Sequence, residues 1–261
     1  MSQFSVIMPI YENDNLDFFK DAYESILNQS VIPNEIIIIV DGPIGSQHKF
    51  FLDEISKYSY VRVLYLEKNH GPGFSRAFGI KNSSHDIIAL MDADDISVND
   101  RFEKQLNYMR DEKLDIVGGW IEEFSKIPGD LNIIRKVPSL HNDIFKHGKW
   151  RMPVNNVTLM FRKQSYYDVG GYTHQRRNED WSLIVRLLAN KKIFYNIPDI
   201  LVHARAGTDM VTRRRKFDHF FNGLKIFFLM HKTGYVNSFV MLANLFVRIL
   251  LRILPQFVTT L

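Results

Sequence analysis

The stretch DIIALMDADD, residues 86–95, ends an apolar run with three acids in four positions. The apolar part has the length and composition of a β-strand that is covered on both faces. In an extended chain residues i and i+2 point to the same side, so Asp92 and Asp94 are expected to face one site while Asp95 points elsewhere. Like charges this close together repel, so we expect either solvent or a cation to offset the repulsion.

Further apolar runs precede this stretch, and amphipathic helical patterns separate them. The predicted strands are FSVIMPI (4–10), EIIIIV (35–40), VRVLYL (61–66) and DIIALM (86–91). The predicted helices are Leu16–Gln29, Gly73–Asn82 and Asn99–Arg110. Strands that alternate with helices indicate βαβ units. Residues 1–115 are therefore predicted to form an open α/β sheet.

The pattern changes after Gly118-Gly119, where shorter strand-like pieces appear. These pieces are residues 120–125, 131–137, 157–162, 193–197 and 200–204, with Pro198-Asp199 between the last two. A helix is expected at 180–190, and from Phe217 onward the chain reads as helical, with breaks near Gly234 and Pro255. We expect residues 1–115 and 116–210 to be two halves of one domain, and residues 211–261 to be a helical extension.

Composition limits the class of protein. The chain has 261 residues, of which 46% are hydrophobic, so it can bury a sizeable core. It contains no cysteine, which excludes disulfides and thiolate metal sites and favours a reducing compartment. The opening MSQFSVIMPIYEND lacks the basic region of a signal peptide. No run of about 18 apolar residues is present, so a simple spanning helix is not expected.

Basic residues are concentrated at the end of the chain, although the formal net charge is only +4. From Arg205 onward the sequence has nine Lys or Arg residues and two Asp residues. A basic, apolar tail favours an anionic surface, such as a membrane face, as its partner. A solvated basic helix face explains the same charges without a partner. No nucleic-acid partner is predicted.

Polar residues follow the predicted strands at one edge of the sheet, where ligands of open parallel sheets bind. Pro9-Ile10-Tyr11-Glu12 follows the first strand, Asp41-Gly42-Pro43 the second, and the three acids the fourth. The paired carboxylates of Asp92 and Asp94 suit a divalent ion that leaves room for phosphate oxygens. An acidic helix N-terminus is the alternative explanation for these acids. Their place at the end of a central strand favours the metal.

Several motifs, taken in order, resemble the family 2 glycosyltransferases of the GT-A fold. They are SVIMPIYEN, ESILNQS, EIIIIVDG, NHGPGFSRAFGI, ALMDADD and NEDWSLIVRL, within residues 4–205. DADDIS…RFEKQL and LVHARAGTDMVTRR are similar to the amylovoran type, which serves bacterial exopolysaccharide and O-antigen assembly. The resemblance implies a single, mostly parallel open sheet flanked by helices, with a C-terminal helical extension. It also implies transfer of a sugar from a nucleotide-sugar, with a UDP-sugar favoured.

The resemblance implies roles for residues at the donor side. Pro9, Tyr11 and Glu12 are expected to line the nucleoside pocket, and Asp41 to bind the base edge. Val40 before Asp41 and Pro43 after Gly42 depart from the family's usual pattern, which leaves the base preference open.

The arginine and acids near the fourth strand are expected to hold the rest of the nucleotide-sugar. Arg76 is expected to approach the nucleotide or hold Asp92. Asp92 and the adjacent Ala93 are expected to contact the ribose, and Asp94 the diphosphate with its ion. That ion is expected to be Mn²⁺ or Mg²⁺, which acts as a Lewis acid on the leaving nucleoside diphosphate.

Catalysis is assigned to the acids Glu179-Asp180. The resemblance implies that Asp180 is the general base that takes the proton of the acceptor hydroxyl, and that Glu179 orients the acceptor. One base without a carboxylate nucleophile implies a single displacement that inverts the anomeric centre. Two helix N-terminal acids that only interact with the helix dipole are the alternative. His203 is a candidate third metal ligand, although a lone histidine is more often structural.

Further residues are candidates for the acceptor side. Arg205 and the cluster Arg213–Arg215 are candidates to neutralise a diphosphate of donor or acceptor. The side chains expected to shape the acceptor pocket are those of Trp120, Trp150, Asn155 and Asn156. Core packing explains the two tryptophans equally well.

The tail has two strongly apolar stretches, residues 220–232 and 236–257. Arg248 and Arg252 stand four residues apart, which fits a helix in the headgroup region with its cations outward. A helix pair packed on the domain, or a dimer contact, is the alternative.

The Q-x-x-R-W motif of the processive relatives is absent. The resemblance therefore implies one sugar per acceptor, with the acceptor carried on undecaprenyl diphosphate. We expect a peripheral protein on the cytoplasmic face of the inner membrane. A non-catalytic sugar- or lipid-binding relative and a sugar-phosphate nucleotidyltransferase are the competing hypotheses. A sugar-phosphate nucleotidyltransferase requires an N-terminal glycine-rich loop, which residues 5–11 do not supply.

Overall fold

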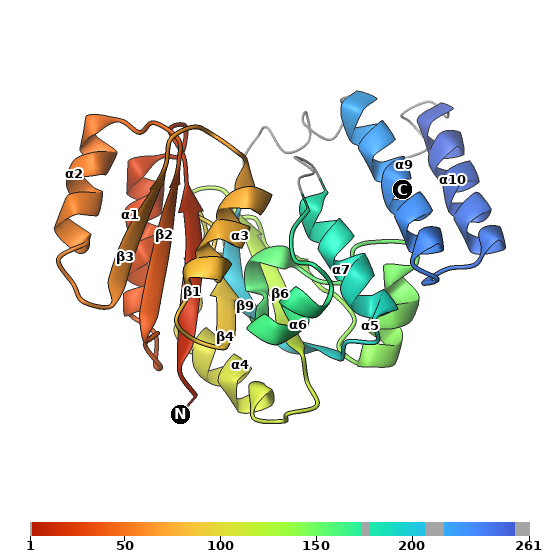
Figure 1. The fold of residues 1–261 in the computed structure, drawn as a ribbon, viewed down its shortest axis with the longest axis horizontal. Coiled ribbons are helices and arrows are strands. Elements are labelled where there is room, and N and C mark those ends of the chain that lie inside the picture. Colours follow the sequence, from red (N-terminus) through yellow and green to blue (C-terminus); the bar gives the residue numbers. More distant parts are fainter. Residues whose placement is uncertain (1, 174–177, 207–216, 254–261) are drawn as a thin grey trace.

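The structure is a computed structural model that describes residues 2–173, 178–206 and 217–253. Within these ranges the strands form one nine-stranded sheet in the order β3-β2-β1-β4-β8-β6-β9-β5, with β7 paired to β6. Helices cover the sheet, and the two C-terminal helices stand together at one end of the molecule (Figure 1). The α/β GT-A-type architecture predicted from the sequence is confirmed.

The first half of the sheet is parallel. Its strands are β1 (Phe4–Ile10), β2 (Glu35–Asp41), β3 (Val61–Leu66) and β4 (Ile87–Leu90). The helices that follow them are α1 (Leu16–Leu27), α2 (Ser46–Ile55), α3 (Pro72–Asn82) and α4 (Arg101–Met109). The strand and helix patterns predicted these elements to within a few residues, apart from α2, which was not predicted. Asn15 caps α1 by accepting hydrogen bonds from the backbone N–H groups of Asp17 and Phe18.

The second half of the sheet is mixed. Its strands are β5 (Ile96–Ser97), β6 (Ile116–Phe124), β7 (Ile133–Arg135), β8 (Met160–Arg162) and β9 (Phe194–Arg205). Its helices are α5 (His141–Gly148), the short 3₁₀ helix η1 (Asn156–Thr158), α6 (Lys163–Asp168) and α7 (Glu179–Ala189). β9 runs parallel to β6, but β8 is antiparallel to both β4 and β6. The expectation of a mostly parallel sheet is therefore correct only for the first half.

Two predicted boundaries in this half are wrong. β6 begins at Ile116 and continues through Gly118-Gly119, whereas the sequence predicted a strand only from residue 120. A side chain at either glycine would collide with Asn196 or Leu201 on β9, so the glycines allow the two strands to pair closely. β9 is one strand, because a register shift against β6 accommodates Pro198-Asp199 without ending the pairing.

Alternate residues of the strands face two separate hydrophobic cores. Val6 and Met8 of β1 pack in the core that α1, α2 and α4 cover. Ile7 of β1 packs in the other core, which α3, α5, α6, α7 and α9 cover. Both faces of the central strands are therefore buried, and this explains why their sequences are nearly continuous apolar runs.

The last elements that the structure describes are α9 (Phe217–Lys232) and α10 (Ser238–Ile253), separated near Gly234 as predicted. The rings of Phe227 and Trp181 meet edge to face, which packs α9 on α7. The Tyr235 hydroxyl donates a hydrogen bond to the Phe145 carbonyl and fixes the turn against α5. No helix among the described residues is long and apolar enough to cross a membrane. Arg213–Arg215 and Pro255 lie outside the described residues, and the three-part division stays a prediction.

Candidate active site

A polar cleft opens where the carboxyl end of β4 meets the N-termini of α3 and α7. Five predicted side chains from these elements line it, those of Arg76, Asp92, Asp94, Glu179 and Asp180. Residues from three distant parts of the sequence therefore share one site. The cleft therefore lies at the carboxyl edge of the sheet, where the sequence predicted a binding site.

Arg76 links the two acidic parts of the cleft. Its Nη2 lies 2.6 Å from Asp92 Oδ1, and its Nη1 lies 3.8 Å from Glu179 Oε1. Burial opposes the positive charge of Arg76, but Asp92, Tyr172 and Glu179 outweigh it and hold the pKa of Arg76 above its usual value. The predicted contact between Arg76 and Asp92 is present, and the guanidinium stays charged.

Gly73 makes room for this link at the start of α3. A Cβ atom at Gly73 would lie 2.7 Å from Glu179 Cγ, which is closer than side-chain atoms pack. Glu179 is buried, and its pKa is raised by burial and by the charge of neighbouring Asp180. The glycine of the turn therefore allows α7 to approach α3 and Glu179 to reach Arg76.

The three acids after β4 have different surroundings. Asp94 is exposed and Asp92 half-buried, while Asp95 is buried and accepts a hydrogen bond from the backbone N–H of Arg205. Burial raises the pKa of Asp95, and the charges of Asp92 and Asp94 raise it further. Asp95 nevertheless lines the cleft together with Asp92 and Asp94, so the structure does not place it apart from the other two acids as predicted. Arg205 does not point freely into the cleft, because its Nε donates to the Asp94 carbonyl and its guanidinium stacks over Phe18 and Phe124.

Asp41 holds the loop between β3 and α3. Its two carboxylate oxygens accept hydrogen bonds of 2.8 Å from the backbone N–H groups of His70 and Gly71. Gly42 has a φ of 97°, and a Cβ there would lie 2.7 Å from the backbone nitrogen of Asn69. This close approach explains the glycine after Asp41. The predicted contact of Asp41 with a base stays a prediction.

The remaining predicted donor-side residues lie near the same edge but do not line the cleft. Pro9, the second-last residue of β1, is half-buried, Tyr11 is half-buried, and Glu12 is exposed. Ala93 is buried between the half-buried Asp92 and the exposed Asp94. Their nucleotide contacts stay predictions.

Asp14 is an acid of this edge that sequence reasoning missed. One of its carboxylate oxygens accepts a 2.9 Å hydrogen bond from the backbone N–H of Tyr11. Burial raises the pKa of Asp14 to about 7, and the charges of Asp94 and Asp92 add to the shift. Its place just before the cap of α1 makes it look like an ordinary helix-start acid, so the sequence carried no signal for it.

We expect Asp14→Asn to stabilise the protein increasingly as the pH rises from 5 to 8. A carboxyl whose pKa is higher in the folded chain than in the unfolded chain costs stability as the pH rises from its usual value through about 7, because a charge must then be buried. The difference in melting temperature between variant and wild type should be near zero at low pH and reach a few degrees above pH 7. Thermal unfolding at four pH values measures it. Asp17→Asn, which alters an exposed acid of the same helix start, is the control and should show no such trend. A pH-independent difference for Asp14→Asn would refute the assigned burial.

Asp180 lies in the first turn of α7, where it lines the cleft. One of its carboxylate oxygens accepts a 2.7 Å hydrogen bond from the backbone N–H of Trp181. Asn178, the residue before α7, has a left-handed backbone with φ 56° and ψ 26°. The backbone turns sharply at Asn178 before α7 begins. The N-terminus of α7, whose dipole favours nearby anions, therefore lies at the cleft with the acids that follow β4.

His203 is not brought together with the two acids. Its Nδ1 lies 2.7 Å from Oε2 of Glu122, its register partner on β6. Within the described ranges, no three His, Cys, Asp or Glu side chains are grouped closely enough to hold a metal ion by themselves. The metal role of His203 stays a prediction, and Glu122 gives the histidine a structural partner.

The predicted acceptor-side residues divide into two kinds. Trp150 is 44% exposed and lines the cleft, and Asn155 and Asn156 line it too. Trp120 is not among the lining residues, and its Nε1 donates a hydrogen bond to the Val137 carbonyl. The Trp120 side chain therefore packs within the domain, which was the alternative to a role on the acceptor side.

Buried polar atoms without hydrogen-bond partners gather around this cleft. In the described part of the chain they include Arg76 Nε, Asn155 Oδ1, Asn156 Oδ1, Asn178 Nδ2 and Trp181 Nε1. Leaving such a buried atom unpaired costs about 1–3 kcal/mol, so native proteins usually pair it with water or a ligand. The cleft therefore has donors and acceptors ready for a polar ligand.

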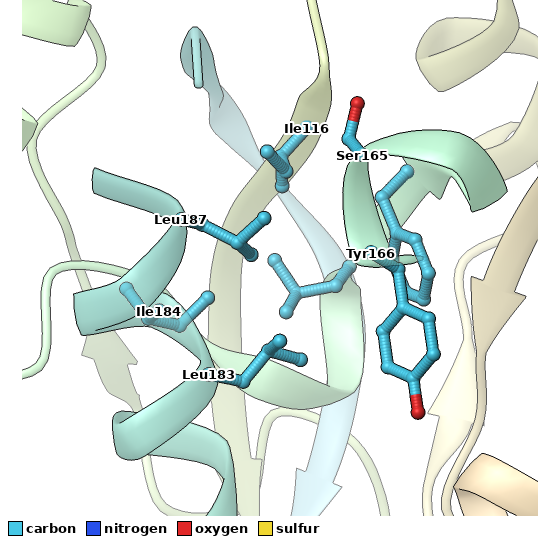
Figure 2. A pocket seen from close by; sticks show the side chains of 8 residues that line it. Ile116, Ser165, Tyr166, Leu183, Ile184 and Leu187 are labelled. Atoms are coloured by element: carbon cyan, nitrogen blue, oxygen red, sulfur yellow. The ribbon is translucent and has the colours of Figure 1, made fainter. Parts of the chain in front are cut away.

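A second, small pocket lies behind α7 and is apolar. Figure 2 shows Ile116, Leu183, Ile184 and Leu187 around it, with the ring of Tyr166 from α6 on the opposite side. No charged side chain lines it, so it is a packing gap of the second core.

Comparison with known proteins identifies the class. Residues 5–166 match the model of Glycosyl transferase family 2, and the chain belongs to this family. It is 35% identical over 254 residues to UDP-Gal:alpha-D-GlcNAc-diphosphoundecaprenol beta-1,3-galactosyltransferase of Escherichia coli, covering 97% of this chain and 92% of that protein. It is 28% identical over 239 residues to the amylovoran biosynthesis glycosyltransferase AmsE of Erwinia amylovora, covering 90% of this chain and 89% of that protein. The chain is thus a family 2 glycosyltransferase of the polysaccharide biosynthesis type.

The fold is also found in solved structures. TarS of S. aureus superposes with a TM-score of 0.68 at 17% identity, over 94% of this chain and 43% of that longer chain. TarS 1-349 in complex with UDP-GlcNAc superposes with a TM-score of 0.66 at 17% identity, over 88% of this chain and 66% of that one. At this identity the likeness concerns the fold.

Proposed function

We propose that this protein is an inverting, metal-dependent, non-processive glycosyltransferase. It moves one sugar from a nucleotide-sugar, with a UDP-sugar favoured, to a saccharide on a lipid diphosphate such as undecaprenyl diphosphate. The observation that carries the proposal is the single cleft that contains Asp92, Asp94, Arg76 and Asp180. The E. coli relative, whose name states a UDP-Gal donor and a diphosphoundecaprenol acceptor, supports the substrate class.

The donor is held at the β4 side of the cleft. Asp92 and Asp94 are the residues that would hold a divalent ion, completed by diphosphate oxygens. They fit a cation because their charges raise the pKa values of Asp14 and Asp95, on top of burial, which is the mark of excess negative charge. A bound ion supplies Lewis-acid assistance to the departing diphosphate.

The transfer itself is carried out across the cleft by Asp180. Its carboxylate accepts the proton of the acceptor hydroxyl while that oxygen attacks the anomeric carbon of the donor. The new carbon–oxygen bond forms as the bond from the anomeric carbon to the diphosphate oxygen breaks. The nucleoside diphosphate leaves with the electron pair, and the anomeric configuration inverts. The unpaired polar atoms of Asn155, Asn156 and Trp181 are suited to orient the acceptor sugar.

We further propose that the protein works as a peripheral protein on the cytoplasmic face of the inner membrane. Exposed apolar side chains on α10 support this placement, since a lipid acceptor is presented there. These side chains are Phe239, Leu242, Phe246, Ile249 and Leu250.

The deciding experiment combines purified protein with UDP-Gal or UDP-GlcNAc and a synthetic GlcNAc diphosphate that carries a long alkyl chain. We expect acceptor-dependent release of UDP that requires Mn²⁺ or Mg²⁺ and is lost with a chelator. NMR of the product should show an inverted anomeric centre. Absence of UDP release from any common sugar nucleotide, with and without acceptor, would instead support a non-catalytic binding protein.

A further inference from the structure

Helix α10 forms one wall of the catalytic cleft. Asn244, Val247 and Arg248 of this helix line the same cleft as Asp180. The Asn244 side chain donates a 3.0 Å hydrogen bond to the carbonyl of Lys149, which fixes α10 to the segment after α5. Figure 1 shows the α9–α10 pair standing beside α5 and α7. The last helix is therefore part of the site rather than a detached tail.

Two arginines line this wall. Arg151, two residues after the anchored Lys149, lines the cleft with Arg248, one helical turn after the anchoring Asn244. Burial lowers the pKa of Arg248, and the positive charge of Arg151 lowers it further. The Arg248 guanidinium is held 5.8 Å from the Trp181 ring and 5.6 Å from the Phe227 ring. Arg248 is thus held at a fixed place, and a second positive charge, that of Arg151, lines the same cleft.

These arginines differ from the cleft arginines that are already engaged. Arg76 pairs with Asp92. The Nη2 atom of Arg205 lies 3.5 Å from Oδ2 of Asp21, and its guanidinium lies over the Phe18 ring. No acidic side chain of the described residues forms an ion pair with Arg151 or Arg248. Two guanidinium groups that line one cleft without an acidic partner are suited to a dianionic ligand that they bind together.

The wall continues from the arginine pair into an apolar surface. Val247 lines the cleft and is 44% exposed, and Trp150, next to Arg151, is also 44% exposed. Beyond them are the exposed apolar side chains of α10, which are Phe239, Leu242, Phe246, Ile249 and Leu250. Starting at Asp180, the surface is therefore polar, then cationic, then apolar. A ligand with a sugar, a diphosphate and a hydrocarbon chain in that order matches it.

We propose that Arg151 and Arg248 form the diphosphate subsite for the lipid-linked acceptor, and that the apolar side chains of α10 contact the start of its hydrocarbon chain. This inference rests on the proposed function, which requires such an acceptor but assigns no residues to it. The guanidinium pair binds the acceptor diphosphate and so sets the attached sugar beside Asp180. The donor diphosphate binds at the opposite wall, near Asp92 and Asp94.

The test compares acceptors that carry the same sugar. One is GlcNAc diphosphate with a long alkyl chain, the second is the same diphosphate with a short chain, and the third is the long-chain alkyl glycoside without diphosphate. For the double variant Arg151→Gln/Arg248→Gln, we expect the KM for the first acceptor to rise about tenfold or more, because charge-assisted hydrogen bonds are lost. The KM for the donor and for the glycoside should stay unchanged.

Two control variants keep this test interpretable. Arg151→Lys/Arg248→Lys retains the charges and should recover most of the affinity. Arg110→Gln removes an exposed charge at the end of α4 and should have no effect. Unchanged melting temperature and unchanged donor KM show that the glutamine variants are folded.

A separate double variant tests the contact with the hydrocarbon chain. Leu242→Ser/Phe246→Ser should remove the preference for the long-chain over the short-chain diphosphate without changing the donor KM. If Arg151→Gln/Arg248→Gln raises the KM equally for all three acceptors, or leaves the KM for the two diphosphates unchanged, the proposed diphosphate subsite is wrong. Transfer by the wild-type protein would still support the proposed function in that case. Wild-type protein that transfers to no acceptor would overturn the proposed function itself.

Discussion

Asp180→Asn should lower the rate of sugar transfer by about 10²–10⁴-fold while leaving donor affinity nearly unchanged. The amide is similar in size and can still accept the hydrogen bond from the backbone N–H of Trp181, so the start of α7 should keep its conformation. What it cannot do is take a proton from the acceptor hydroxyl. Steady-state transfer measured beside equilibrium binding of the nucleotide-sugar separates these two effects.

Glu179→Gln is the matched comparison, since it alters the adjacent acid of the same helical turn. Glu179 is 8% exposed and faces Arg76, whereas Asp180 is half-buried at the cleft. We expect the Glu179 variant to weaken donor binding or stability more than the chemical step. Wild-type turnover in Asp180→Asn would show that another group is the base, and the acids of α7 would then serve only the helix dipole.

The parallel half of the fold was predictable from the sequence because its pattern is local. The residues Ile36 to Val40 of β2 are fully buried, and a strand covered on both faces must be apolar at every position. The acids after β4 were predictable for the same reason, since a polar turn after such a strand lies at the sheet edge. Asp180 shares the cleft with Asp92, but it lies at the start of α7 and was implied by the family resemblance rather than by a strand pattern.

The mixed half was harder to predict because its geometry depends on pairing between distant segments. Pro198 has no backbone N–H to give to a ladder, so by itself it indicates a strand end. Only the shifted register against β6 allows β9 to continue past it. In the same way, the presence of Arg151 and Arg248 in one cleft depends on how α10 packs against the segment after α5, which no local pattern encodes.

Arg101 is the clearest residue that the sequence hides. A charged residue at the start of an amphipathic helix is normally exposed, yet Arg101 is completely buried. Its Nη2 donates hydrogen bonds of 2.7 Å to the Leu90 carbonyl and 3.0 Å to the Val157 carbonyl. Its Nη1 donates to the hydroxyl of Ser97 at 2.9 Å. The side chain thus ties the end of β4, and with it the acidic turn, to η1 and β5.

Arg101→Met should destabilise the protein by about 3–5 kcal/mol, because it leaves two buried carbonyls without their donor and removes a positive charge that favours the ionised form of Asp95. The charge alone does not explain this loss. Burial lowers the pKa of Arg101 to about 9 despite the nearby charges of Asp92 and Asp95, so removing the charge recovers some desolvation free energy. The larger contribution comes from the lost hydrogen bonds, because methionine occupies the space of the arginine side chain but cannot donate to the two carbonyls.

Urea unfolding of Arg101→Met and of Arg110→Met measures this difference on one helix. Arg110, which follows the last residue of α4, is exposed, and its replacement should change the free energy of unfolding by less than about 0.5 kcal/mol. Because Arg101 positions the acidic turn without lining the cleft, the Arg101 variant should also raise the donor KM more than it lowers kcat. An Arg101 variant as stable as wild type would mean that the Leu90 and Val157 carbonyls find other donors. The position of Asp92 would then depend on Arg76 alone.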